Sequence, residues 1–174
     1  MTSTTSPELP EESAPTAPRS MAELDRDEAL ALLGSVNMGR IVFTRNALPA
    51  IRPVNHALVD GHLVIRTHES AALTHAVDGS GTVVAYEADM IDQETHLGWS
   101  VVVTGFARLV TDPDQLARYE KLVAPWVGRA MEHAVLIRLD MVNGFRMTDA
   151  DEGRSKRTAK PEEGRAPGRR VGAD

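Results

Sequence analysis

The sequence predicts a mainly β (α+β) domain, a small barrel of six antiparallel strands with peripheral helices. Apolar and β-branched runs outnumber helical patterns and come in the order helix, three strands, helix, two strands, helix, strand. The dipeptide Asp60-Gly61 lies between two alternating runs and is the strongest hairpin signal in the chain. Strands that follow one another directly in the sequence are mainly antiparallel neighbours, which favours a small barrel over a doubly wound parallel sheet.

The first expected element is a helix that begins at Asp25. Asp25 and Glu28 have the spacing of a capping box, and Leu24 occupies the hydrophobic-staple position. Gly34 is a natural end for this helix. Residues 39–67 (GRIVFTRNALPAIRPVNHALVDGHLVIRT) then predict three strands separated by two turns.

The turn at Asp60-Gly61 sets the register of the predicted hairpin, so that Val54 faces Thr67 and Asn55 faces Arg66. Because side chains alternate along a strand, one face of the hairpin is mostly apolar and ends in an arginine and a hydroxyl, while the other is more polar. The first face holds Arg52, Val54, His56, Leu58, Leu63, Ile65 and Thr67, and the second holds Asn55, His62, Arg66 and His68. One packed face is typical of a barrel wall.

The second half of the chain alternates helix and strand. A helix is expected after Asp112, because Asp at the N-cap is followed by Pro at N1 and Gln at N3. Pro125 ends this helix at about residue 124. The other expected elements are a short Ala-rich helix at 70–77 and strands at 82–88, 99–110 and 134–147.

Charge and composition divide the chain into one domain, 21–149, and two tails. Residues 1–20 contain four prolines and almost nothing to bury, and residues 150–174 carry many charges of both signs, so both tails are expected to be disordered. The formal net charge of −6 and the pI near 5.5 argue against a nucleic-acid surface. There is no secretory signal and no apolar run of about 20 residues, which favours a cytoplasmic protein without membrane attachment.

Few motifs point to chemistry. The chain has no cysteine, no phosphate-binding loop motif and no nucleophile motif, and its six histidines lack metal-ligand spacing, so no catalytic side chain and no metal are expected. The most informative cluster is Arg52 and Thr67 on one hairpin face, Arg66 next to them and the turn at Ser70. An arginine, a hydroxyl and the free N–H groups of a helix start can bind a phosphate.

Three stretches carry a resemblance to a known family. They are 39–67, with PVN before the hairpin and R-T after it, VVAYEADMID at 83–92 and HLGWSVVVTGFARLV at 96–110. With the first helix and the last strand, the chain resembles the pyridoxamine 5′-phosphate oxidase-like FMN-binding split-barrel superfamily, and within it the nitroimidazole-reductase-like branch. The resemblance implies a six-stranded antiparallel split barrel that forms a homodimer with two flavin sites at the subunit interface.

The resemblance also implies roles for particular residues. Arg52, Pro53, Val54 and Asn55 would border the flavin ring and the ribityl chain. The phosphate end would lie near Arg66, Thr67 and Ser70, and Trp99 and Ser100 would close the site from another strand. Such a site joins an apolar wall for the ring with a few polar groups that orient it.

One departure affects the choice of cofactor. Many relatives have Ser-Lys or Arg-Lys where this chain has Ala71-Ala72, and the lysine would contact the phosphate as a point charge. FMN is the expected cofactor. A deazaflavin coenzyme is an alternative, because related proteins of high-GC bacteria use it and 16 Arg to 3 Lys indicates such a genome; haem is a third candidate.

The leading functional interpretation is a dimeric oxidoreductase in which bound flavin passes hydride or electrons to a small-molecule acceptor. A deazaflavin-dependent reductase, a non-catalytic flavin or haem carrier or sensor, and an unliganded interaction module are the alternatives. Alternating apolar residues are expected to supply the contact between subunits: Val101, Val103, Ile137 and Leu139.

Overall fold

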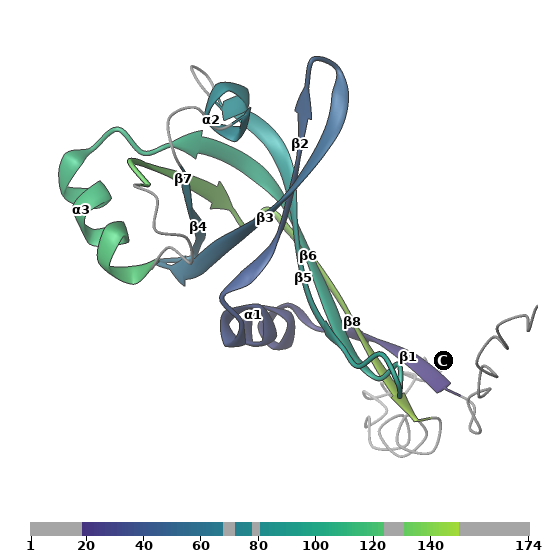
Figure 1. Ribbon diagram of the computed structural model, residues 1–174. Helices are drawn as coiled ribbons and strands as arrows, with labels where there is room; N and C mark the ends of the chain where they lie inside the picture. Colours follow the sequence, from purple (N-terminus) through teal and green to yellow (C-terminus); the bar gives the residue numbers. More distant parts are fainter. Residues whose placement is uncertain (1–18, 68–71, 78–80, 124–130, 150–174) are drawn as a thin grey trace, which may run out of the picture.

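Six antiparallel strands close into a barrel, as predicted; Figure 1 shows the course of the strands. The computed structural model describes residues 19–67, 72–77, 81–123 and 131–149. In this part of the chain the sheet order is β1-β8-β6-β5-β2-β3-β4-β7, and β7 also pairs with β6, so that β2 to β7 form the barrel while β8 and β1 lie outside it. The strands are β1 (Arg19–Leu24), β2 (Met38–Arg45), β3 (Leu48–Val59), β4 (His62–Thr67), β5 (Thr82–Ile91), β6 (Gly98–Leu109), β7 (His133–Arg138) and β8 (Met141–Asp149).

The described residues form three helices around the barrel: α1 (Arg26–Ser35), α2 (Ala72–Val77) and α3 (Pro113–Leu122). The predicted N-caps are confirmed, because the Asp25 carboxylate accepts from the Glu28 N–H at 2.8 Å and the Asp112 carboxylate accepts from the Gln115 N–H at 2.9 Å. Helix α1 continues past Gly34 by one residue. Among the described residues, no helix is long and apolar enough to cross a membrane.

The hairpin between β3 and β4 has the predicted turn, with φ of 49° at Asp60 and 72° at Gly61, which is the left-handed geometry of a type I′ turn. The register is also as predicted from Val59 opposite His62 to His56 opposite Ile65.

Beyond His56 the predicted hairpin pairs are wrong. The pairing of β3 with β4 ends at His56 opposite Ile65, so Val54 does not pair with Thr67 and Asn55 does not pair with Arg66. Asn55 pairs with Met38 on β2, and Thr67 pairs with His133 on β7. The physical reason is barrel closure, since the long strand β3 leaves β4 and completes its hydrogen bonds with β2.

The expected last strand at 134–147 is two strands, β7 and β8, separated by a corner at Asp140. The Asp140 carboxylate accepts hydrogen bonds from the Phe106 N–H at 3.1 Å and from the Arg138 guanidinium at 3.1 Å. Strand β6 passes from β8 to β7 at this corner, and a Cβ on Gly105 would lie 1.7 Å from the Arg138 carbonyl oxygen. A close approach of this kind requires glycine.

The first strand is not among the expected elements. Strand β1 pairs with β8 from Arg19 opposite Asp149 to Leu24 opposite Gly144, and so it includes the last two residues of the segment expected to be disordered. Residues 1–18 and 150–174 lie outside the described part of the chain, and the disorder of the tails stays a prediction.

Two clusters of buried side chains hold the fold together. The main core fills the barrel and includes Leu63, Ile65 and Tyr86, while a second core between the barrel and α3 includes Val64 and Tyr119. Strand β4 is therefore buried on both faces. At about 1.5–3 kcal/mol for each fully buried large apolar side chain, both cores contribute substantially to stability.

Candidate functional site

The residues predicted to border the flavin divide between the two faces of β3. Pro53 and Asn55 pair with Arg40 and Met38 of β2 and share their face, which is the outside of the barrel. Val54 lies on the inner face and packs against the main core. Arg52 has the same orientation but is exposed, and its Nη1 donates to the Ile51 carbonyl at 2.7 Å.

The residues predicted for the phosphate end also point to opposite sides. Thr67 is buried, whereas the Arg66 side chain lies under α3, is 10% exposed and donates to Glu120 Oε1 at 3.3 Å and to the Met131 carbonyl. It lines a pocket of about 440 Å³ with Leu116 of α3 and other residues. Arg66 therefore has partners of its own in the monomer, and its role in phosphate binding stays a prediction; Ser70 lies outside the described residues.

On β6, the side chains of Trp99 and Ser100 also point to opposite faces of the sheet. Trp99 is buried in the main core, while Ser100 faces outward between Asp89 of β5 and Phe145 of β8.

Four residues were expected to contact a second subunit (Val101, Val103, Ile137 and Leu139), and this expectation is wrong for the first three. Val101, Val103 and Ile137 fill the barrel core, because it is their face of the strands that points inward.

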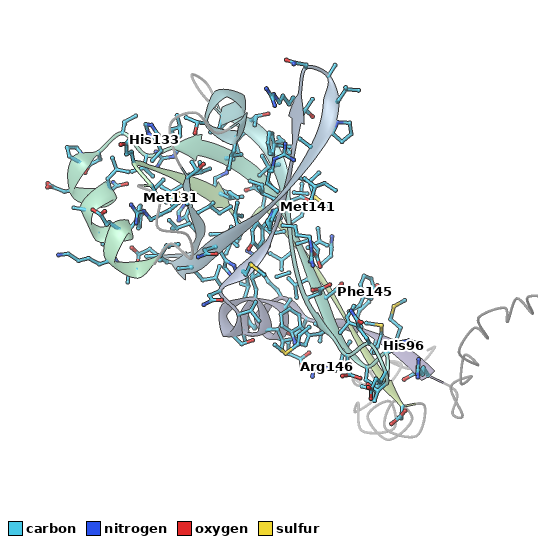
Figure 2. The ribbon with its side chains drawn as sticks, viewed as in Figure 1. His96, Met131, His133, Met141, Phe145 and Arg146 are labelled. Carbon is cyan, nitrogen blue, oxygen red and sulfur yellow. The ribbon has the colours of Figure 1, made fainter. Side chains whose placement is uncertain are left out.

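The structure thus brings Pro53, Asn55 and Ser100 onto one surface, which we call the outer face: the solvent side of β3, β2, β5, β6 and β8. Two strands separate β3 from β6, so that Asn55 and Ser100 lie about 14 Å apart at the usual strand spacing. Large apolar side chains are exposed along this face, among them Met38, Ile51, Met141 and Phe145. Figure 2 labels Met141 and Phe145.

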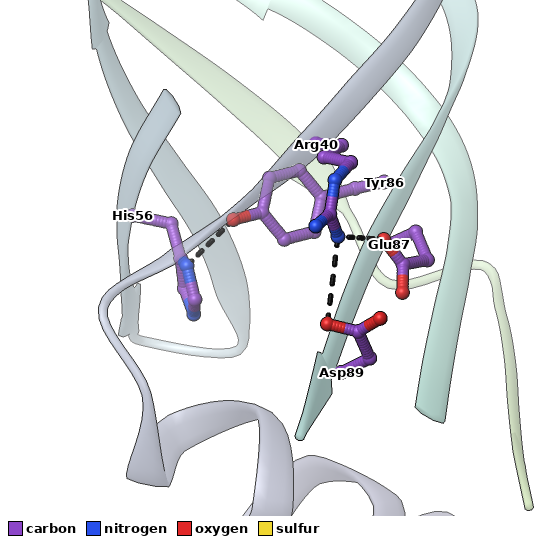
Figure 3. A network of polar contacts seen from close by, with 5 residues as sticks. All are labelled: Arg40, His56, Tyr86, Glu87 and Asp89. Carbon is purple, nitrogen blue, oxygen red and sulfur yellow. Dashed lines mark hydrogen bonds and ion pairs between the residues drawn. The ribbon is translucent and has the colours of Figure 1, made fainter. Parts of the chain in front are cut away.

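An ion-pair cluster on β2 and β5 lies on the outer face between β3 and β6, the strands that carry the two predicted halves of the site. Figure 3 shows the cluster. Arg40 Nη1 is 2.9 Å from Glu87 Oε2 and 3.5 Å from Asp89 Oδ1. Hydrogen bonding to Glu87, together with the charges of both carboxylates, raises the pKa of Arg40 above its usual value. Two carboxylates on one guanidinium leave a net negative charge at the centre of the face.

Sequence reasoning missed this cluster. The only signal was the alternation of Glu87 and Asp89 on β5, which places both side chains on one face. Their position opposite Arg40 depends on the pairing of β2 with β5, which connects residues 47 positions apart.

A buried polar pair lies on the inner side of the same strands (Figure 3). The Tyr86 hydroxyl is 2.6 Å from His56 Nδ1, and His56 Nε2 is 3.0 Å from the Leu33 carbonyl oxygen. A carbonyl can only accept, so Nε2 donates to it and Nδ1 of the neutral ring accepts from Tyr86. Burial lowers the pKa of His56 and raises that of Tyr86 far above its usual value, so both groups are neutral near pH 7.

The described residues contain no group of three His, Asp or Glu side chains placed to hold a metal ion. What the outer face offers is a set of exposed apolar side chains beside polar and charged groups from neighbouring strands. An arrangement of this kind suits a flat aromatic ligand that needs orienting contacts.

A family model of pyridoxamine 5′-phosphate oxidase matches residues 25–146 of the chain. An uncharacterized protein of Mycobacterium tuberculosis, Rv0080, is 54% identical over 137 residues, which cover 77% of this chain and 90% of the relative.

Two solved structures show similar folds. A candidate pyridoxamine 5′-phosphate oxidase of Corynebacterium glutamicum is 30% identical, with a TM-score of 0.63 over 75% of this chain and 99% of the other. The FAD binding protein of Mycobacterium smegmatis is 31% identical, with a TM-score of 0.56 over 73% of this chain and 98% of the other.

Proposed function

The chain belongs to the pyridoxamine 5′-phosphate oxidase family, and on this basis we propose that it is a homodimeric flavin-dependent oxidoreductase acting on a small-molecule acceptor. The observation that carries the proposal is the outer face. Pro53 and Asn55 of β3 and Ser100 of β6 lie on this surface, which carries exposed apolar side chains around the Arg40 ion-pair cluster.

The same face supports the dimer. Ile51 is 56% exposed and Met141 is 58% exposed, and both belong to the outer face together with Met38 and Phe145. Several large apolar side chains exposed on one face are typical of a surface that binds another molecule. A second copy of the chain, related by a twofold axis, would cover it and enclose a flavin from both sides.

In this proposal the protein binds and orients the flavin, and the flavin supplies the redox chemistry. Asn55 and Ser100 are polar groups that can hydrogen-bond the edge of the ring system, while Pro53 contributes an apolar surface. The negative charge around Arg40, Glu87 and Asp89 disfavours an anionic acceptor at this position.

FMN is the proposed cofactor, with a deazaflavin coenzyme as the alternative and haem as a third candidate. The missing lysine at Ala71-Ala72 and the engagement of Arg66 by Glu120 both reduce the positive charge available to a phosphate, which favours testing other flavins beside FMN. FAD is one of these, because the Mycobacterium smegmatis relative is an FAD-binding protein.

Mass spectrometry of the ligand released from purified protein tests which cofactor is bound, and FMN is the expected result. Oxidation of the reduced cofactor by added acceptors then separates an enzyme from a carrier or sensor, since a carrier would show no turnover. Ser100→Ala is expected to weaken flavin binding two- to tenfold by removing one hydrogen bond. Ser35→Ala on α1 is the matched control and should leave binding unchanged; equal losses in both variants would count against the outer face.

A further inference from the structure

Strand β3 changes its partner at His56. Asn55 is the last residue of β3 that pairs with β2, and His56 is the first that pairs with β4, where it lies opposite Ile65. The backbone N–H of His56 donates to the Asn37 carbonyl at 3.0 Å, just before β2 begins. The course of β3 across the barrel, and with it the place of Asn55, is therefore set at this residue.

The His56 side chain connects this point to two other elements. It is 3% exposed, accepts from Tyr86 of β5 at 2.6 Å and donates to the Leu33 carbonyl of α1 at 3.0 Å. The His56 and Tyr86 rings also meet edge to face, with centroids 5.1 Å apart and an interplanar angle of 67°. One side chain thus connects β3, β5 and α1 inside the barrel.

Gly39 of β2 makes room for this connection. A Cβ at Gly39 would lie 2.4 Å from the Tyr86 hydroxyl oxygen and 2.3 Å from the Glu87 carbonyl oxygen. Gly39 pairs with Val54, within the segment predicted to border the flavin. The hydroxyl therefore reaches His56 only because the strand between them carries no side chain at this position.

We propose that His56 is a positioning residue for the flavin site: through Tyr86 and the Leu33 carbonyl it holds β3 at its crossing, so that Asn55 and Pro53 are presented on the outer face. The proposal rests on the proposed function. His56 itself lies inside the barrel and acts on the flavin through the strand.

Four variants test this. Tyr86→Phe removes only the hydroxyl, and Tyr119→Phe in the second core is its matched control. His56→Gln keeps one acceptor and one donor, while His56→Leu keeps neither. Two readouts are needed: the Kd for FMN from quenching of flavin fluorescence, and hydrogen exchange of the backbone N–H groups in 50–56, where Pro53 has none.

Tyr86→Phe and His56→Leu are expected to raise the Kd two- to tenfold and to speed amide exchange in 50–56, with His56→Gln close to wild type and Tyr119→Phe unchanged. An unchanged Kd in Tyr86→Phe, whatever its melting temperature, would overturn the positioning role, because a purely structural contact lowers stability alone. If the wild-type protein does not quench FMN, the proposed function fails instead. In that case amide exchange still tests whether His56 holds β3 in place, and unchanged exchange of residues 50–56 in Tyr86→Phe and His56→Leu would overturn that role.

Discussion

Arg66 is the residue at which sequence and structure lead to different expectations, and replacing it tests both. The resemblance assigns Arg66 to the flavin phosphate, while in the structure its guanidinium donates to the Met131 carbonyl and to Glu120. The two roles are compatible if the phosphate displaces Glu120, whose side chain is 67% exposed.

The structure gives the magnitudes for Arg66→Ala. The ion pair with exposed Glu120 contributes about 0.2–1 kcal/mol, and the charged hydrogen bond to the Met131 carbonyl about 1.5–3 kcal/mol. The free energy of unfolding should therefore fall by about 2–4 kcal/mol. If Arg66 also contacts the phosphate, FMN binding should weaken by a further 1.5–3 kcal/mol, or roughly 10- to 150-fold, with riboflavin unaffected.

Glu120→Gln separates the two roles, because it removes the competing carboxylate and leaves Arg66 in place. It should strengthen FMN binding a few-fold and cost less than about 1 kcal/mol of stability. Ala72→Lys should strengthen FMN binding as well, and less so at high salt, since an exposed charge is screened. Arg118→Ala, which removes an exposed arginine of α3 paired with Asp60, is the control and should change neither ligand.

Titration of flavin fluorescence with FMN and with riboflavin, alongside urea denaturation, measures these effects. Equal FMN affinities in wild type, Arg66→Ala and Glu120→Gln would refute the phosphate role. Arg66 would then be a residue that only anchors α3.

Three further predictions follow from the structure. Burial holds the pKa of His56 below its usual value of 6.5, so below that pH the unfolded chain takes up a proton that the folded chain does not. The free energy of unfolding should therefore fall by up to about 1.4 kcal/mol per pH unit below pH 6.5. Urea denaturation measures this, and the same pH dependence in His56→Gln as in wild type would contradict it. Gly105→Ala should cost about 3 kcal/mol or more, because its Cβ would meet the Arg138 carbonyl at 1.7 Å, and a melting temperature equal to wild type would show the corner to be adaptable. Light scattering should give twice 18.9 kDa for the full chain, and a chain trimmed to 19–149 should likewise give twice its own single-chain mass. Ile51→Asp should give the monomer, and a monomeric wild type would contradict the dimer.

The parts of the fold that could be predicted are those determined locally. The N-caps at Asp25 and Asp112 depend on residues three positions apart, and the turn at Asp60-Gly61 depends on two residues with positive φ. Strand alternation likewise placed His56 on the buried face.

The parts that were missed depend on distant partners. Strand β3 divides its hydrogen bonds between β4 and β2, and nothing local marks the change at His56. The corner at Asp140 follows from an acceptor for the Phe106 N–H, 34 positions earlier in the chain. Strand β1 was missed because its pairing partner is β8, at the other end of the described chain.

The candidate site shows the same limit. Arg52 through Asn55 read as one segment in the sequence, but only Pro53 and Asn55 reach the outer face. The Arg40 cluster and the contact between Tyr86 and His56 both depend on which strands become neighbours when the barrel closes.

Flavin binding at the outer face is the central claim, and an equilibrium titration of FMN with the purified, ligand-free protein tests it most directly. The expected result is saturable quenching of FMN fluorescence with one flavin bound per chain, weakened two- to tenfold in Ser100→Ala. No saturable quenching with FMN, FAD or a deazaflavin coenzyme would contradict it.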